Sequence, residues 1–250
     1  MTAGDERMFE RIAVKSFDSH VLDGHLYRAT VSPAPGLVMI PEIYGITQSL
    51  SETAARYAGE GFAVLVLDIF SRIKPGIVLA YDQAGHKQGR HHHDHDFDYE
   101  LGIKDVQAAV STLRGRPECN GRVGVVGFCL GGTMAYLASA RTDADAAVGY
   151  YGTRIHGYLD DAKAIDRPLL LHFGERDHTT PPEVLAQIIP AVSGNPHVKW
   201  HVYPDAVHAF ANHVRPAHYN AAATAQADQR TFALFRAQLD PSRRSETSVA

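Results

Sequence analysis

The chain has 250 residues, of which 45% are hydrophobic and 21% charged, and its formal net charge is −4. This composition is typical of a folded globular protein, and the acidic balance disfavours a nucleic-acid partner because no basic stripe is available to displace counterions. The longest apolar runs, such as residues 62–67, are too short to cross a bilayer, so we expect no contact with a membrane.

Apolar runs of strand length alternate with helical stretches along the chain. The predicted strands are 11–17, 36–41, 62–70, 121–128, 146–152, 168–174 and 198–204. The predicted helices are 49–60, 98–114, 131–141, 182–193 and 219–239. This alternation predicts an α/β fold with a mostly parallel central sheet flanked by helices.

The sequence contains no repeat and no Pro/Gly/Ser-rich linker, so we predict a single domain over residues 1–240. Residues 71–97 separate a strand from a helix and predict a long loop that could lie over the site. The last residues, 241–250, are polar and predict a flexible tail.

Cysteine usage and the N-terminus favour a cytoplasmic protein. There are 2 cysteines, Cys119 and Cys129, which imply no disulfide framework, and the polar N-terminus shows no secretory signal. Cys119 lies in a PECNG turn, where a structural role is the expectation.

The stretch GFCLGG at 127–132 follows a predicted strand and precedes a predicted helix. Small residues such as Gly127 and Gly131 are needed on both sides of a nucleophile elbow, where strand and helix backbones nearly touch. In such a turn Cys129 lies at a helix N-terminus, which favours its thiolate, and the Leu130 N–H points toward a developing oxyanion. The alternative is a small buried cysteine in a tight turn, because free cysteines are usually buried and inert.

A nucleophile on this type of sheet is followed along the chain by an acid and then a histidine. Asp177 comes directly after the apolar run 168–174, and His208 follows the run 198–204. Cys129, Asp177 and His208 therefore appear in the required order, each at the carboxyl end of a strand, where open α/β sheets bind ligands. Three neighbours remain alternatives for these roles: Asp205, Glu175 and His178.

Short blocks along residues 11–237 resemble those of the dienelactone hydrolase family. These blocks are PEIYGI (41–46), DIFSR (68–72), GFCLGG (127–132), VGYYG (148–152), GERDHTTP (174–181) and HAF (208–210). The resemblance implies an α/β-hydrolase fold and a cysteine hydrolase acting on enol-lactones or related small esters, with no cofactor. It also implies that Glu42 pairs with the resting Cys129 and that the Ile43 N–H is the second oxyanion donor. An exposed loop glutamate is the alternative for Glu42.

The chain departs from the family where the substrate carboxylate is bound by arginines. Four residues beyond the predicted catalytic histidine, the family's arginine is replaced by Asn212, and Arg215 follows three positions later. In the long loop, Lys87 stands at the matching position and Arg90 is nearby. A lysine cannot reproduce the bidentate contact of an arginine, so dienelactone itself is in doubt while the hydrolytic residues are complete.

The run HHHDHD at 91–96 raises the possibility of a metal site, because His91 and His95 could share zinc on one helix face. We favour a solvent-facing polar loop and predict no metal, since the proposed triad leaves no role for one. A further interpretation is that His91 or a neighbour lines the substrate entrance.

The sequence thus predicts a Cys–His–Asp hydrolase of small lactones or esters that acts through a thioester, as a monomer or small homo-oligomer. Two alternatives stay open. A thiol-reactive or redox protein needs a resolving cysteine, for which only Cys119 is available. A non-catalytic binding module with a hydrolase-like fold predicts the loss of a triad residue.

Overall fold

The computed structural model describes residues 8–240, so the tail predicted at 241–250 lies outside the described residues. The chain divides into two units at Val123 and Gly124, inside strand β5 (Cys119–Phe128). The single domain expected over 1–240 stays a prediction.

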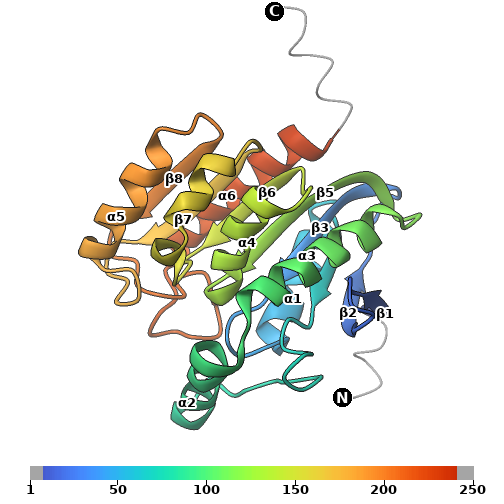
Figure 1. The fold of residues 1–250 in the computed structure, drawn as a ribbon, viewed down its shortest axis with the longest axis horizontal. Coiled ribbons are helices and arrows are strands. Elements are labelled where there is room, and N and C mark those ends of the chain that lie inside the picture. The colour runs from blue at the N-terminus through green and yellow to red at the C-terminus, as the bar shows by residue number, and fades with distance from the viewer. Residues whose placement is uncertain (1–7, 241–250) are drawn as a thin grey trace, which may run out of the picture. The chain divides into compact units, whose positions relative to one another are not determined.

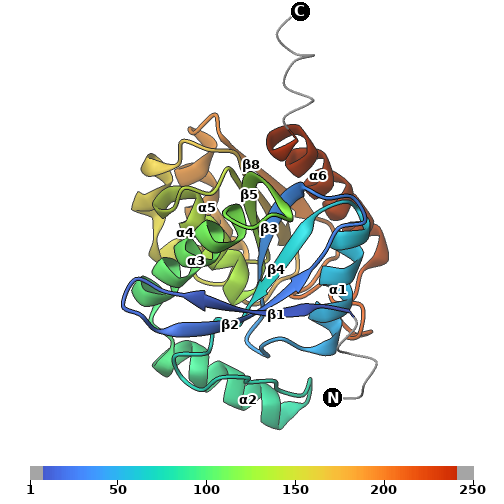
Figure 2. The same cartoon turned by 90° about the vertical axis from the view of Figure 1, so that its right-hand side faces the viewer.

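The first unit has strands in the order β1-β2-β4-β3. These strands are β1 (Glu10–Lys15), β2 (Val21–Tyr27), β3 (Ala34–Ile40) and β4 (Ala63–Leu67). β2 pairs antiparallel with both β1 and β4, whereas β3 and β4 are parallel. Helix α1 (Gln48–Gly59) covers one face of these strands and α3 (Tyr99–Arg114) the other (Figure 2).

In the second unit the strands are all parallel, in the order β5-β6-β7-β8. The elements after β5 are α4 (Leu130–Arg141), β6 (Ala146–Tyr150), η3 (Ile155–Gly157), η4 (Leu159–Ala164), β7 (Leu169–Gly174), α5 (Pro182–Ser193), β8 (Val198–Tyr203) and α6 (Ala221–Leu239). Figures 1 and 2 show α4 and α5 on one face of these strands and α6 on the other. The predicted α/β fold, with parallel strands between helices, is confirmed.

Burial explains why these segments form the core. Every residue of β4 (AVLVL) and of β6 (AAVGY) is buried, as expected for strands covered on both faces. Nearly all of α4 is buried too, and its Gly and Ala residues allow close packing on β6. Within residues 8–240, no helix combines the length and apolarity that a bilayer span requires.

Two stretches of the first unit differ from the sequence prediction. Strand β2, VLDGHLY, was not predicted, because its outward positions hold Asp23 and His25 and its centre is Gly24. The expected loop at 71–97 contains helix α2 (Gln83–His91) and a π-helical turn, η2 (His92–Asp96). Asp82 starts α2 by accepting the Gly85 N–H at 2.7 Å, a cap that supports a short helix containing two glycines.

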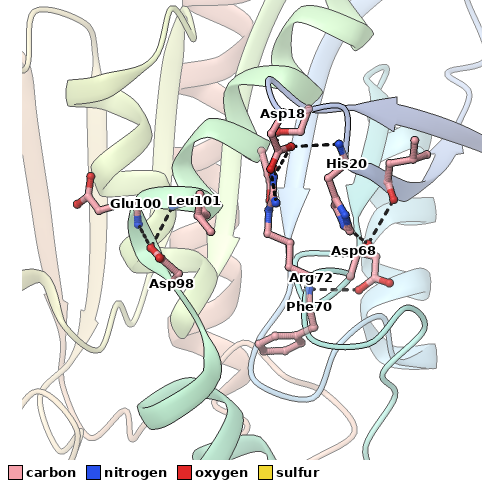
Figure 3. A network of polar contacts seen from close by, with 12 residues as sticks. Asp18, His20, Asp68, Phe70, Arg72, Asp98, Glu100 and Leu101 are labelled. Atoms are coloured by element: carbon pink, nitrogen blue, oxygen red, sulfur yellow. Dashed lines mark hydrogen bonds and ion pairs between the residues drawn. The ribbon is translucent and has the colours of Figure 1, made fainter.

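The block DIFSR at 68–72 forms polar contacts with several parts of the first unit. The Asp68 carboxylate accepts the N–H groups of Phe70 and Gly76, at 3.3 and 2.8 Å, and so closes the turn after β4 (Figure 3). Arg72 donates two hydrogen bonds to the buried Asp105, both 2.7 Å long, and two more to Asp18. This block therefore has a structural role that accounts for its polar residues.

Candidate active site

The turn between β5 and α4 has the geometry of a nucleophile elbow. Cys129 has φ 57° and ψ −114°, a backbone conformation with positive φ that residues other than glycine rarely adopt. A Cβ atom on Gly127 would lie 1.9 Å from the carbonyl oxygen of Gly131, which explains why a glycine is needed there. The elbow predicted at 127–131 is confirmed as a strand–turn–helix unit.

Cys129 is held at the start of α4 by its own backbone. Its N–H donates to the Tyr150 carbonyl at 3.0 Å, and its carbonyl accepts the Thr133 N–H at 3.2 Å in the first helical turn. The side chain is 6% exposed and stands at a helix N-terminus, where the dipole favours negative charge. The Leu130 N–H belongs to the same first turn, whose amides have no acceptor within the helix.

Asp177 and His208 meet at the carboxyl ends of β7 and β8. Asp177 Oδ2 lies 2.8 Å from His208 Nδ1, and the carboxylate is fully buried. Its other oxygen, Oδ1, accepts the N–H and the hydroxyl of Thr179 at 2.7 and 2.6 Å. Burial raises the pKa of Asp177, but the bonds from His208 and Thr179 outweigh it, so the pKa is lowered and the carboxylate is ionised.

Cys129 interacts with the same His208 side chain. Burial lowers the pKa of His208, but its interactions with Cys129 and Asp177 raise it to about 10. The structure thus brings together the three residues predicted as the triad.

The alternative candidates have other surroundings. The Asp205 carboxylate is 66% exposed and pairs with Arg176 at 2.5 Å. Glu175 accepts the Asp205 N–H at 3.1 Å. His178 packs edge-on against the His208 ring, with 6.0 Å between centroids. Asp177 is therefore the carboxylate that contacts His208 at Nδ1.

A family model described as the dienelactone hydrolase family matches residues 22–239. The chain belongs to the dienelactone hydrolase family. Carboxymethylenebutenolidase from Pseudomonas putida is 33% identical over 221 residues, covering 88% of this chain and 93% of that enzyme. Carboxymethylenebutenolidase 1 from Cupriavidus pinatubonensis is 35% identical over 218 residues, covering 87% and 92%.

The fold is shared with solved structures. A dienelactone hydrolase from Anabaena variabilis has a TM-score of 0.67 to this chain at 20% identity, covering 93% of this chain and 99% of that one. At this identity the likeness shows the fold alone. Together the matches make this member of the dienelactone hydrolase family a hydrolase of small lactones or esters with an α/β-hydrolase fold.

The loop that carries His208 contains a second set of contacts, which the sequence analysis missed. The His208 carbonyl accepts the Nδ1–H of His218 at 2.8 Å, and Arg215 donates to His218 Nε2 at 3.0 Å. Arg215 therefore helps to hold the loop. Asn212, at the position where the dienelactone hydrolase resemblance implies an arginine, is 7% exposed.

Thr179 is the other residue that sequence reasoning missed. Its hydroxyl lies 2.6 Å from Asp177 Oδ1 and 2.9 Å from His208 Nδ1. The available signal was its position two residues after the acid, where a backbone N–H commonly returns to an Asp side chain. The hydroxyl contact with His208 could not be deduced from spacing.

Glu42 and Ile43 lie in the first unit, in the loop after β3. They are 7% and 5% exposed, so the exposed-loop alternative for Glu42 is wrong. Helix α2 covers this loop closely, because a Cβ on Gly89 would lie 2.8 Å from the Ile43 carbonyl oxygen. The roles implied for Glu42 and Ile43 in the reaction stay predictions.

The remaining substrate-contact candidates lie on α2. Lys87 and Arg90 are exposed, and Arg90 pairs with Asp94 at 2.8 Å. His91 is 62% exposed and lies 3.7 Å from Asp96. The run predicted as a solvent-facing loop is instead the end of α2 and the turn η2, and its His93 is buried, 2.8 Å from the Tyr99 hydroxyl. Within residues 8–240, no three side chains are placed to hold a metal ion.

A cavity of about 700 Å³ also opens in the first unit. It is lined by the β1–β2 hairpin, the start of α1 and residues 75–78, and includes Asp23 and Asp68. None of the candidate site residues named above is among its described lining. The Asp68 carboxylate there has its turn-closing bonds to Phe70 and Gly76, so it is accounted for by the fold.

Proposed function

We propose that this chain hydrolyses small lactones or esters with Cys129 as the nucleophile and a thioester as the intermediate. The supporting observation is the His208 ring, which bonds to the buried Asp177 carboxylate and also interacts with Cys129. Together the three residues provide a nucleophile, a proton carrier and a group that orients it.

In the first half of the proposed reaction, the Cys129 thiolate attacks the substrate carbonyl carbon and forms a C–S bond. The Leu130 N–H stabilises the oxyanion that develops. The tetrahedral intermediate collapses by breaking the bond to the leaving oxygen, which takes the proton from His208 and leaves that ring neutral. In a lactone the leaving group remains part of the same molecule.

In the second half, neutral His208 accepts a proton from water as the water oxygen attacks the thioester carbonyl. The C–S bond breaks, the acid product leaves and the thiolate–imidazolium pair is restored. Asp177 holds the ring with Nδ1–H toward the carboxylate throughout, so that Nε2 exchanges the proton. Substrates with stabilised leaving groups, such as enolates, suit this site because a thiolate displaces them readily.

The test compares an activated aryl ester and a dienelactone, the latter chosen because relatives are named carboxymethylenebutenolidase. Cys129→Ala should lower kcat on either substrate on the order of 10³-fold or more. Cys119→Ala is the matched control, since it removes the chain's other free cysteine. Mass spectrometry of the quenched reaction should find the acyl group on Cys129.

Equal turnover by Cys129→Ala and Cys119→Ala would refute the cysteine mechanism. If the wild type turns over neither substrate while Cys129 is rapidly alkylated, the thiol-reactive alternative is favoured. Turnover of the aryl ester alone would identify an esterase whose specificity differs from that of the named relatives.

A further inference from the structure

A chain of polar side chains runs through the second unit behind the nucleophile elbow. It runs from α6 through β8 and β7 back to α6, and from there through β6 to α6 again. In order, its members are Arg230, Tyr203, His172, Thr231, Tyr150 and Asp228. The successive distances between their polar atoms are 2.9, 2.9, 3.1, 2.7 and 3.0 Å.

The hydrogen positions in this chain follow from its two ends. Arg230 can only donate, so the Tyr203 oxygen accepts from it and leaves the Tyr203 hydroxyl hydrogen available to His172 Nδ1. With Nδ1 as an acceptor, a neutral His172 carries its proton on Nε2 and donates it to Thr231.

The other end is fixed in the same way. The Tyr150 hydroxyl donates to the Asp228 carboxylate, which can only accept, so the Tyr150 oxygen is free to accept from Thr231. All five hydrogen bonds then point from the guanidinium to the carboxylate. A single tautomer of His172 satisfies every link.

The surroundings of His172 agree with a neutral ring. The side chain is completely buried, and burial together with His201 of β8 and Arg230 of α6 lowers its pKa well below the usual value. The other titratable groups among these hydrogen-bonded side chains are the Tyr203 and Tyr150 hydroxyls and Asp228. The Asp228 carboxylate contacts Tyr150 and is one hydrogen bond beyond it as counted from His172.

These hydrogen-bonded side chains hold the segment Tyr150–Tyr151, which contacts the candidate active site. The Tyr150 carbonyl accepts the Cys129 N–H at 3.0 Å, and the Tyr151 N–H donates to the His172 carbonyl at 2.7 Å. Tyr151 has φ 40°, a strained conformation, and its ring packs edge-on against His208 with 5.2 Å between centroids. Two adjacent residues thus contact both the nucleophile and the histidine.

We propose that His172 is a positioning residue, which holds the segment that supports Cys129 and His208. It touches neither substrate nor reacting atoms, and it acts through Tyr150 and Tyr151. This inference rests on the proposed function for its effect on rate, because a misplacement of reacting groups by a fraction of an ångström slows a preorganised reaction. The tautomer itself follows from the hydrogen bonds alone.

The first test is ¹⁵N NMR of the histidine rings in the full-length wild-type protein. The expected result is a His172 ring with a protonated Nε2 and a bare Nδ1, unchanged between pH 5.5 and 8. In Tyr203→Phe the donor to Nδ1 is lost, so the Nδ1–H tautomer should become populated. A wild-type His172 that carries its proton on Nδ1, or that titrates in this range, would overturn the proposal.

The second test is kinetic and uses a matched pair of buried tyrosines. Tyr136→Phe is the control, because the Tyr136 hydroxyl donates to the Tyr158 carbonyl at 2.9 Å and is not part of the hydrogen-bonded series around His172. Tyr203→Phe should lower kcat about tenfold with little change in KM, whereas Tyr136→Phe should leave kcat unchanged. Equal kcat values in the two variants would also overturn the positioning role.

Failure of the proposed function has a separate signature. If Cys129→Ala retained wild-type turnover, the cysteine mechanism would fail, but the NMR pattern of His172 would still be measured without any turnover. A wrong tautomer in an enzyme that depends on Cys129 would refute the positioning role alone.

Discussion

Two buried histidines of the second unit have opposite charge preferences. His208 is 8% exposed and His172 is completely buried, yet the pKa of His208 is raised and that of His172 is lowered. Burial lowers the pKa of both rings, so the difference comes from their partners. His208 contacts the ionised Asp177 carboxylate and interacts with Cys129, whereas His172 contacts hydroxyl groups and lies near a guanidinium.

The difference separates a proton carrier from a structural ring. A histidine that is held between two anions can gain and lose a proton during a reaction. A histidine whose nitrogens are matched to one donor and one acceptor is kept in one tautomer and one charge state. The same residue type therefore serves two roles within one unit, and the charges of its neighbours decide which.

The largest expected effect comes from removing the anion beside His208. Asp177→Asn should lower kcat on the order of 10³-fold, because the amide no longer stabilises an imidazolium or fixes the ring's tautomer. The pKa of His208 should fall toward that of an ordinary histidine, which ¹⁵N NMR measures. Asp205→Asn is the control, since that carboxylate is exposed and pairs with Arg176; a similar loss in both variants would contradict the assignment of Asp177.

The two histidines should also give opposite slopes to stability against pH. The His208 pKa is raised from 6.5 to about 10, so its contribution is complete below pH 6.5 and is lost as pH rises toward 10. The His172 pKa is lowered from 6.5, so the folded protein loses stability as pH falls below 6.5. Each group changes the free energy of unfolding by at most about 1.4 kcal/mol per pH unit.

Urea unfolding between pH 5 and 9 measures these slopes. Cys129→Ala removes an interaction that raises the His208 pKa and should flatten the alkaline side. His172→Gln should flatten the acidic side only. Curves for the two variants that keep both wild-type slopes would show that other groups control the pH dependence.

The sequence predicted the parts of the site that depend on chain order. Gly127 marks a turn that excludes a larger residue, and the order of Cys129, Asp177 and His208 follows from the way strands end at one edge. The five predicted helices correspond to α1, α3, α4, α5 and α6, with ends that differ by at most two residues.

The parts that were missed depend on contacts across the fold or on weak local signals. Helix α2, QAGHKQGRH, contains two glycines and no apolar face, so periodicity gives no signal. Strand β2 has the alternating burial of a strand with one exposed face, but its polar positions obscured it. Thr179 and His172 gain their roles from hydrogen bonds 2.6–3.1 Å long to residues up to 59 positions away, which spacing cannot reveal.

The smallest expected effect comes from the Thr179 hydroxyl, which lies between the two members of the charged pair. Thr179→Val keeps the shape of the side chain and the backbone N–H bond to Asp177, but it removes the hydroxyl contacts with Oδ1 and with His208 Nδ1. That hydroxyl lowers the pKa of Asp177, so the pKa should rise in the variant. We expect a kcat about threefold lower and a free energy of unfolding lower by about 1 kcal/mol. Thr179→Ser restores the hydroxyl and should recover both values, which aryl-ester turnover and urea unfolding measure. If the serine variant is as impaired as the valine variant, the effect comes from packing and not from the hydroxyl.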